Sequence, residues 1–158
     1  METIRQVVPF FADFVLEPEN GTLQLRWNEI GSENLFGAHQ ASDGTLRLIA
    51  LVTLLSQPNQ EIPDLILIDE PELGLHPQAL NVIAGLLKAV SVHKQIIVAT
   101  QSPSLLNSFE PDDVIVVERQ GRESIFRRLD PAPLSDWLND YSLADLWEKN
   151  VLGGGVYR

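Results

Sequence analysis

The sequence predicts an α/β fold in which helices flank a mostly parallel sheet. Residues 65–68 are all apolar, without alternation, as in a strand that is buried on both faces of a parallel sheet. Residues 95–100 form a second strand pattern of the same kind. Between the two, apolar residues recur at helical spacing from Pro77 to about Val92, and proline suits the first turn of a helix.

A small β-hairpin region is predicted near the start of the chain. The dipeptide Asn-Gly at 20–21 is a turn signal. Residues 23–27 then alternate between apolar and polar side chains, which predicts a half-buried strand. A short strand at 35–36 would complete the hairpin.

The remaining patterns predict further helices and strands. Apolar residues at helical spacing over 46–54 indicate an amphipathic helix, and Ser42 or Asp43 would suit its N-cap. We expect strands at 114–117 and 124–129, a helical pattern over 134–147 and a flexible glycine run at 153–155. We therefore predict a single partial domain over 1–158, made of a hairpin region (1–40), a central part (41–130) and a helical tail (131–158).

The composition limits the classes of function. With a net charge of −11, the chain repels phosphate backbones and is a poor stand-alone nucleic-acid binder, although the arginines between 119 and 128 leave a local basic patch open. The absence of cysteine excludes disulfides and thiolate zinc sites. No apolar run approaches the roughly 20 residues of a membrane helix, so no membrane partner is predicted and a cytoplasmic location fits.

Two carboxylates, Asp69 and Glu70, follow the strand predicted at 65–68. The C-terminal ends of strands line the ligand crevice of an open α/β sheet, and neighbouring strand residues point in opposite directions. The run LILIDE at 65–70 resembles the Walker B strand of P-loop ATPases, in the form found in ABC-type ATPase heads. The resemblance implies that Asp69 holds Mg²⁺ and that Glu70 polarises the water that attacks the γ-phosphate of ATP.

Three further segments resemble parts of such a head. Ser42, Asp43, Gly44 and Thr45 are similar to the ABC signature loop in the form of a bacterial branch related to RecF and the OLD proteins, and Asp43 replaces a common glycine. Residues 73–77 resemble the D-loop. Together they imply a homodimer in which residues 42–45, called below the signature-like loop, meet a γ-phosphate on the partner head. Gln101 stands where the switch segment usually has histidine, which implies that it senses or positions rather than transferring a proton.

One part of a P-loop ATPase is missing. The phosphate-wrapping Walker A motif needs a Gly-Lys pair, and the sequence contains none. The resemblance therefore covers only the C-terminal half of a head, whether as a fragment, a split gene product or a degenerate lobe. We expect ATP and Mg²⁺ to be bound and hydrolysed only with a partner that carries Walker A, and nucleic acid to be bound only through the complete protein.

Two other functions remain open from the sequence. The chain could be a non-enzymatic module for dimerisation or interaction, derived from such an ATPase. It could also be a metal-dependent nuclease that uses Asp69, Glu70 and Glu72, although these acids form one short run without a second cluster. His76 is a candidate ligand beside Glu70 and Glu72, but a single histidine in a loop is more typical of a hydrogen-bonded turn.

Overall fold

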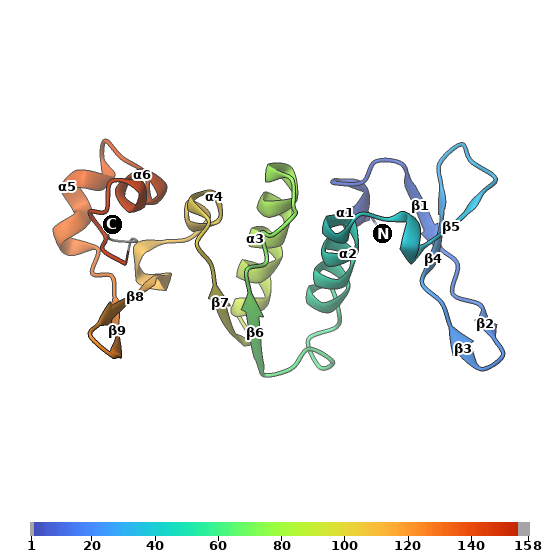
Figure 1. Cartoon of the computed structure of the whole chain (residues 1–158), viewed down its shortest axis with the longest axis horizontal. Helices are drawn as coiled ribbons and strands as arrows, with labels where there is room; N and C mark the ends of the chain where they lie inside the picture. The colour runs from blue at the N-terminus through green and yellow to red at the C-terminus, as the bar shows by residue number, and fades with distance from the viewer. Residues whose placement is uncertain (1, 155–158) are drawn as a thin grey trace. The chain divides into compact units, whose positions relative to one another are not determined.

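The computed structural model describes residues 2–154, and the chain divides after Ala99 into two compact units. Each unit contains both helices and strands, so the predicted α/β class is confirmed (Figure 1). We call residues 2–99 the first unit and residues 100–154 the second unit. The single partial domain predicted over 1–158 stays a prediction.

The first unit begins with the predicted β-hairpin region. Strand β4 (Arg26–Glu29) lies between β1 (Phe11–Phe14) and β5 (Leu35–Gly37) in an antiparallel sheet. Two short strands, β2 (Pro18–Glu19) and β3 (Thr22–Leu23), form a hairpin whose turn holds Asn20 and Gly21 at φ of 51° and 76°. A short helix, α1 (Glu2–Arg5), precedes these strands, and a 3₁₀ turn, η1 (Ala38–Gln40), follows them.

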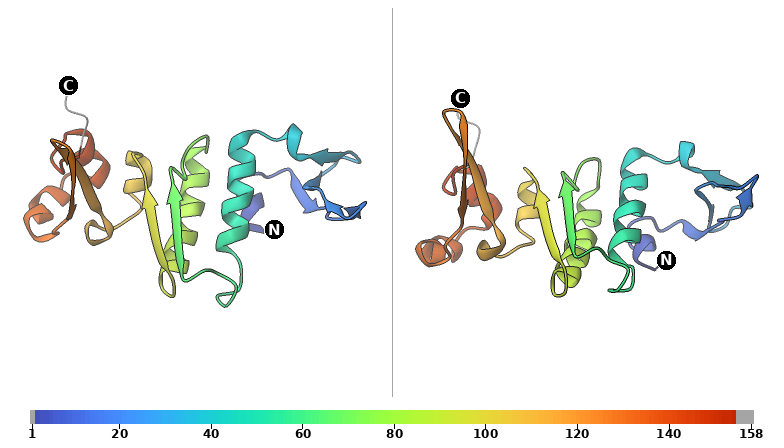
Figure 2. Two further views of the ribbon diagram at one scale, coloured as in Figure 1. Left: turned by 60° about the horizontal axis from the view of Figure 1, so that its bottom comes forward. Right: turned by 90° about the horizontal axis from the view of Figure 1, so that it is seen from below.

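A strand–helix–strand unit follows, as the apolar pattern predicts. Strands β6 (Leu65–Asp69) and β7 (Gln95–Ala99) pair in parallel, with Leu65 opposite Gln95 and Asp69 opposite Ala99 (Figure 2). The helix between them, α3 (Pro77–Ser91), packs on β7 and also on α2 (Asp43–Leu55). The core of this part consists of the apolar faces of α2 and α3 together with Ile66.

The prediction that residues 65–68 are buried on both faces is wrong. Ile66 is buried, but Leu65 and Leu67 on the other face are 48% and 69% exposed. On β7, Ile97 is 50% exposed. Helix α3 covers one face of the β6–β7 pair, and no helix of the first unit covers the other, so a pattern that is typical of a central strand occurs here on a strand with one open face.

The second unit has its own small core. Strands β8 (Ile115–Gln120) and β9 (Glu123–Arg128) form an antiparallel hairpin, and α4 (Pro103–Leu106) packs on α6 (Leu143–Glu148). The helical pattern over 134–147 is broken into η3 (Ala132–Leu134), α5 (Ser135–Leu138) and α6, and another 3₁₀ turn, η2 (Pro111–Asp113), precedes β8. Its main cluster of buried residues consists of Val116, Leu129, Leu143, Leu146 and Leu152, and Leu105 on α4 is also buried.

The described glycines of the run predicted at 153–155 make defined contacts. Gly153 and Gly154 have φ of 79° and 74°, and the N–H of Gly154 donates to Glu118 Oε1 at 2.9 Å. Arg127 Nη2 also donates to the carbonyl oxygen of Leu152 at 2.6 Å. Side chains of the β8–β9 hairpin thus bond to this part of the chain, while residue 155 lies outside the described residues and the predicted flexibility stays a prediction.

In the part of the chain that the structure describes, no helix combines the length and the apolar character needed to cross a membrane.

Candidate functional site

The two predicted carboxylates stand at the C-terminal end of β6. Asp69 is the last residue of the strand and is exposed, and Glu70 follows it and is half-buried. The parallel pairing places Asp69 opposite Ala99, and the N–H of Glu70 donates to the carbonyl oxygen of Ala99 at 2.8 Å. Both acids therefore lie at the C-terminal ends of the paired strands, where α/β folds bind ligands.

Glu70 has an uncommon backbone conformation. Its φ is 45°, in the left-handed region that non-glycine residues rarely adopt. Its carbonyl oxygen accepts from the N–H of Leu73 at 3.2 Å, so the chain turns sharply directly after the strand. Pro71 within this turn is fully buried and has no N–H to continue the ladder. Such a strained backbone conformation persists only where the surrounding structure maintains it. Residues of this kind are often found at functional sites.

The signature-like loop forms the N-terminus of α2. Ser42 is the N-cap, and its Oγ accepts from the N–H of Thr45 at 3.1 Å and lies 2.9 Å from Thr45 Oγ1. Asp43 is exposed in the first helical turn, where the positive end of the helix dipole stabilises a negative charge. Of the two N-cap candidates that the sequence offered, Ser42 is therefore the cap. The carboxylate of Asp43 faces solvent.

The signature-like loop contacts the segment that follows Glu70. Gly44 is buried, and a Cβ at its position would overlap the carbonyl oxygen of Gly74. In the opposite direction, a Cβ on Gly74 would lie 3.5 Å from the Cα of Gly44. The two backbones can touch because Gly44 has no side chain, whereas a Cβ on Gly74 would make only an ordinary contact. The structure thus brings the signature-like loop against the loop that follows Glu70.

Arg47 joins the same two segments, and the sequence analysis did not find it. Its Nη1 donates to the carbonyl oxygen of Glu70 at 3.0 Å, across 23 positions of the sequence. A signal was available, because Arg47 is the only basic residue of α2 and lies between the buried residues Gly44 and Leu48. A cation on an otherwise apolar stretch of helix needs a polar partner.

His76 is a helix cap. Its Nδ1 accepts from the N–H of Gln78 at 3.3 Å, at the start of α3. Among the residues that the structure describes, no three His, Cys, Asp or Glu side chains gather in a way that could hold a metal ion. The nuclease reading, which needs Asp69, Glu70 and Glu72 around one ion, therefore gains no support.

The donor set at the end of β6 fits Mg²⁺ in a different manner. Magnesium in nucleotide sites is held by one or two protein carboxylates together with waters and substrate phosphates. Asp69 is exposed at a strand end and can supply such a carboxylate. The residues present thus fit a magnesium ion that arrives with a nucleotide.

Gln101 lies in the second unit. It is exposed, two residues beyond the end of β7. Its neighbour Ser102 caps α4, with its Oγ accepting from the N–H of Leu105 at 3.2 Å. The role of Gln101 stays a prediction, as do the catalytic role of Glu70, the metal-binding role of Asp69 and the phosphate-binding role of residues 42–45.

An ion pair joins β6 and β7 at the end opposite the carboxylates. Lys94 Nζ lies 2.7 Å from Asp64 Oδ1, and the N–H of Gln95 donates to the carbonyl oxygen of Asp64 at 2.9 Å. The hydrogen bond and charge of Lys94 hold the pKa of the Asp64 carboxyl below its usual value. The backbone hydrogen bond between Gln95 and Asp64 extends the β6–β7 pairing by one residue, and the exposed ion pair lies beside it.

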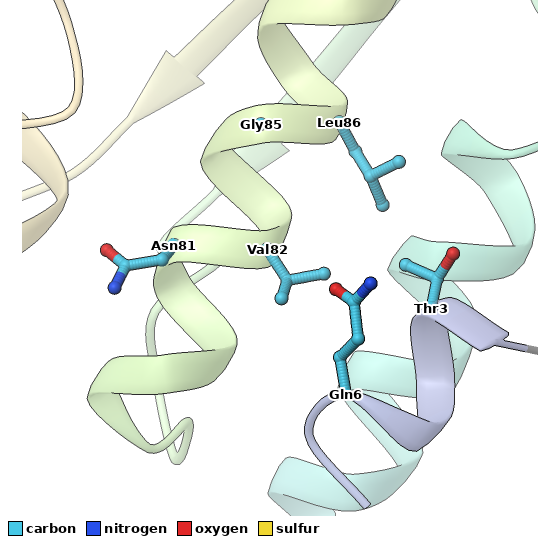
Figure 3. A pocket seen from close by; sticks show the side chains of 6 residues that line it. All are labelled: Thr3, Gln6, Asn81, Val82, Gly85 and Leu86. Atoms are coloured by element: carbon cyan, nitrogen blue, oxygen red, sulfur yellow. The ribbon is translucent and has the colours of Figure 1, made fainter.

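A pocket elsewhere in the first unit lacks groups for chemistry. It has a volume of about 440 Å³ and lies between α1 and α3 (Figure 3). Its lining consists of Thr3, Gln6, Asn81, Val82, Gly85 and Leu86. None of these side chains is charged or titratable, so the pocket does not compete with the end of β6 as a candidate active site.

Comparison with known proteins gives the family. Residues 2–107 match the family described as "AAA domain, putative AbiEii toxin, Type IV TA system". This match covers more than half of the chain. The chain belongs to this AAA-domain family. The AAA-domain match includes α2, β6, α3 and β7, and therefore the signature-like loop and both carboxylates.

The curated relatives match part of the chain. The energy-coupling factor transporter ATP-binding protein EcfA2 of Staphylococcus aureus (strain USA300) is 32% identical over 106 residues, which are 62% of this chain and 35% of that protein. The chain thus spans about a third of the length of the curated relatives that it matches. The chain is therefore an AAA-family domain that is similar, over this stretch, to part of an ATP-binding protein.

Two solved structures show the fold. One comes from work on ATP-driven dimerization and DNA-stimulated activation of SMC ATPases, with a TM-score of 0.65 and 20% identity over 88% of this chain and 86% of that chain. The other is the Smc head domain of Pyrococcus furiosus bound to the C-terminal domain of ScpA, with a TM-score of 0.67 and 20% identity over 88% of this chain and 35% of that chain. The predicted P-loop NTPase fold of the ABC type is therefore confirmed.

Proposed function

We propose that this chain is the C-terminal lobe of an ATP-hydrolysing ABC-type head of the RecF/OLD-like branch. The observation that carries the proposal is the contact between the signature-like loop and the loop that follows Asp69 and Glu70. Gly44 touches Gly74, and Arg47 donates to Glu70. Two segments that the resemblance links to ATP chemistry are thus adjacent within one unit.

In this proposal the two acids have separate tasks. Asp69 would hold Mg²⁺, directly or through water, and the ion would supply charge stabilisation for the transferred phosphoryl group. Glu70 accepts a hydrogen bond from the attacking water and takes its proton. The half-buried position of Glu70 suits a base that is partly shielded from bulk solvent, while the exposed Asp69 suits contact with an arriving nucleotide.

The remaining roles involve a second copy of the head. The N–H groups at the start of α2 meet the γ-phosphate on the partner head, and Gln101 positions water or senses that phosphate. Residues 73–77 couple the two nucleotides, so the complete head works as a homodimer. Nucleic acid, where it takes part, binds to the complete protein, and a cytoplasmic location supplies ATP and Mg²⁺.

The proposal includes a partner that carries Walker A. The sequence has no Gly-Lys pair to hold the β- and γ-phosphates. In the described part of the first unit, β6 pairs only with β7, so each strand has one edge without a neighbour. Leu65, Leu67 and Ile97 on the open face are 48%, 69% and 50% exposed. A strand and helix from a Walker A half would pair with such an edge and cover these side chains.

The test is reconstitution. The chain is mixed with the product of the reading frame directly upstream of its Met1 codon, and Mg²⁺-dependent ATP turnover is measured with Glu70→Gln and Asp69→Asn variants. We expect turnover with the mixture, none with the chain alone, and a loss of at least about a hundredfold in Glu70→Gln. Turnover by the chain alone, or equal turnover with Glu70→Gln, would contradict the proposal.

A second candidate is a non-enzymatic interaction module. It is favoured by the same exposed apolar face on β6 and β7, which offers a docking surface whether or not ATP is hydrolysed. A stable complex with the upstream product that shows neither ATP binding nor turnover would support this alternative over the ATPase.

A further inference from the structure

Arg47 is a link between the signature-like loop and the predicted base. It lies on α2 five residues after the Ser42 cap, and the residue is half-buried. Its Nη1 donates to the carbonyl oxygen of Glu70 at 3.0 Å. A partly buried arginine that bonds to a backbone carbonyl, rather than to a carboxylate, fixes the position of that peptide group.

The backbone of Glu70 is held on both sides of its Cα. Its N–H is fixed by the carbonyl oxygen of Ala99, and its carbonyl oxygen accepts from both Arg47 and Leu73. The left-handed φ of 45° is unfavourable for glutamate and persists only where its surroundings maintain it. Since the two peptide planes determine the direction of the Cα–Cβ bond, these hydrogen bonds also determine where the carboxylate points.

We propose that Arg47 is a positioning residue for Glu70. It maintains the left-handed turn after β6 and thereby the direction of the Glu70 carboxylate. Because Arg47 lies near the start of α2, the direction of the carboxylate depends on the position of that part of the helix. This inference rests on the proposed ATPase function for its consequence in catalysis. The hydrogen bond from Arg47 to Glu70 lies within one chain. A displacement of the α2 N-terminus therefore changes the orientation of the base in the same head.

The first test uses the isolated full-length chain. Arg47→Met removes every donor but keeps much of the aliphatic stem, and Arg47→Lys restores one shorter donor. Arg5→Met is the matched control, because Arg5 Nε also donates to a backbone carbonyl in the first unit, that of Phe11 at 3.0 Å. The readouts are the NMR shift of the Glu70 carbonyl carbon and the amide hydrogen exchange of Leu73.

We expect Arg47→Met to move the Glu70 carbonyl resonance and to speed exchange at Leu73 roughly tenfold, as for the loss of one hydrogen bond. Arg47→Lys should recover part of the change, and Arg5→Met should leave both readouts as in the wild type. An unchanged Glu70 resonance and Leu73 exchange in Arg47→Met would overturn the inference, as would equal changes in Arg5→Met.

The second test uses the reconstituted ATPase. In a mixture that turns over ATP, Arg47→Met should lower kcat about tenfold or more with KM for ATP unchanged, and Arg47→Lys should fall between the two. An unchanged kcat in Arg47→Met would overturn the inference. Absence of turnover with the wild-type chain would instead count against the proposed function, and the NMR measurement would still decide whether Arg47 holds Glu70.

Discussion

Gly44 and Gly74 touch through their backbones. The first lies in the opening turn of α2 and the second in the loop after Glu70, and any side chain on Gly44 would overlap the carbonyl oxygen of Gly74. Gly74 also has a φ of 78°, which favours glycine. The contact between these segments therefore depends on two glycines, each for a different physical reason.

We expect Gly44→Ala to destabilise the first unit by about 3 kcal/mol. The added methyl group meets a backbone carbonyl, which cannot rotate away as a side chain could, so α2 and the loop after Glu70 must separate. Urea unfolding monitored by circular dichroism measures the change. Hydrogen exchange at Leu73 should also become faster, because the displaced loop loses its turn.

Gly85→Ala is the control for this prediction. Gly85 lies inside α3, and a Cβ there meets no atom within 4 Å. Alanine in this exposed helical position should stabilise the chain by about 0.5–1 kcal/mol. If both variants shifted stability in the same direction, the overlap with Gly74 would not be the cause.

The open face of β6 gives a second prediction. Leu67 is 69% exposed, so Leu67→Ser should change the free energy of unfolding by no more than about 0.5 kcal/mol. It should also reduce self-association of the chain in sedimentation experiments, because it removes exposed apolar surface. The neighbouring Ile66 is 6% exposed, and Ile66→Ser should cost about 3 kcal/mol or more. Equal destabilisation by the two variants would show that both faces of β6 are covered.

Gly154 in the second unit gives a third prediction. A Cβ there would lie 2.8 Å from Val116 Cγ1 in the buried core, and φ is 74°. We expect Gly154→Ala to destabilise the second unit by about 3 kcal/mol, from backbone strain and overpacking together. The matched control is Gly121→Ala, which has a φ of 64° but no neighbour within 4 Å and should cost only about 1 kcal/mol. Thermal unfolding of both variants separates the two contributions, and equal losses would exclude the overlap with Val116.

Asp145 makes the stability of α6 depend on pH. Its Oδ2 accepts from the hydroxyl of Ser142 at 2.6 Å and from the Ser142 N–H at 2.9 Å, and these bonds hold the pKa of the carboxyl below its usual value of 3.8. A lowered folded pKa means that the contribution is complete above about pH 3.8, the unfolded value. It is lost as the pH falls through the folded pKa.

The measurement compares the wild type with Asp145→Asn, whose side chain does not titrate. The wild type should be the more stable protein at about pH 6, and the difference in unfolding free energy should shrink as the pH is lowered toward about 2. A difference that stayed constant over this range would show that the ionised carboxylate does not contribute.

Local patterns in the sequence predicted the elements of the βαβ unit. Four consecutive apolar residues predicted β6, and Pro77 was predicted as the start of α3 and is its first residue. The position of Asp69 and Glu70 at a strand end followed from the same pattern, because a strand ends where its apolar run ends. The resemblance to ABC-type heads supplied the fold, which the likeness to SMC head structures confirms.

Long-range contacts were beyond the reach of those patterns. Two contacts join residues more than 20 positions apart: Gly44 with Gly74, and Arg47 with Glu70. The spacing of apolar residues does not predict contacts between positions so far apart in the sequence. The N–H of Gly154 bonds to Glu118, which local composition could not show. The exposure of one face of β6 was not predicted either. An apolar run indicates that a strand is stable when buried, but it does not indicate which segment covers each face.

By itself, the sequence determined the strand–helix–strand order over residues 65–99, and it placed two acids after a strand, because these properties depend on residues that are close along the chain. Only the tertiary structure decided that Glu70 is held in a left-handed turn by Arg47 and that the start of α2 lies against that turn. Those features arise from the packing of distant segments, where the geometry of both partners determines which atoms can meet.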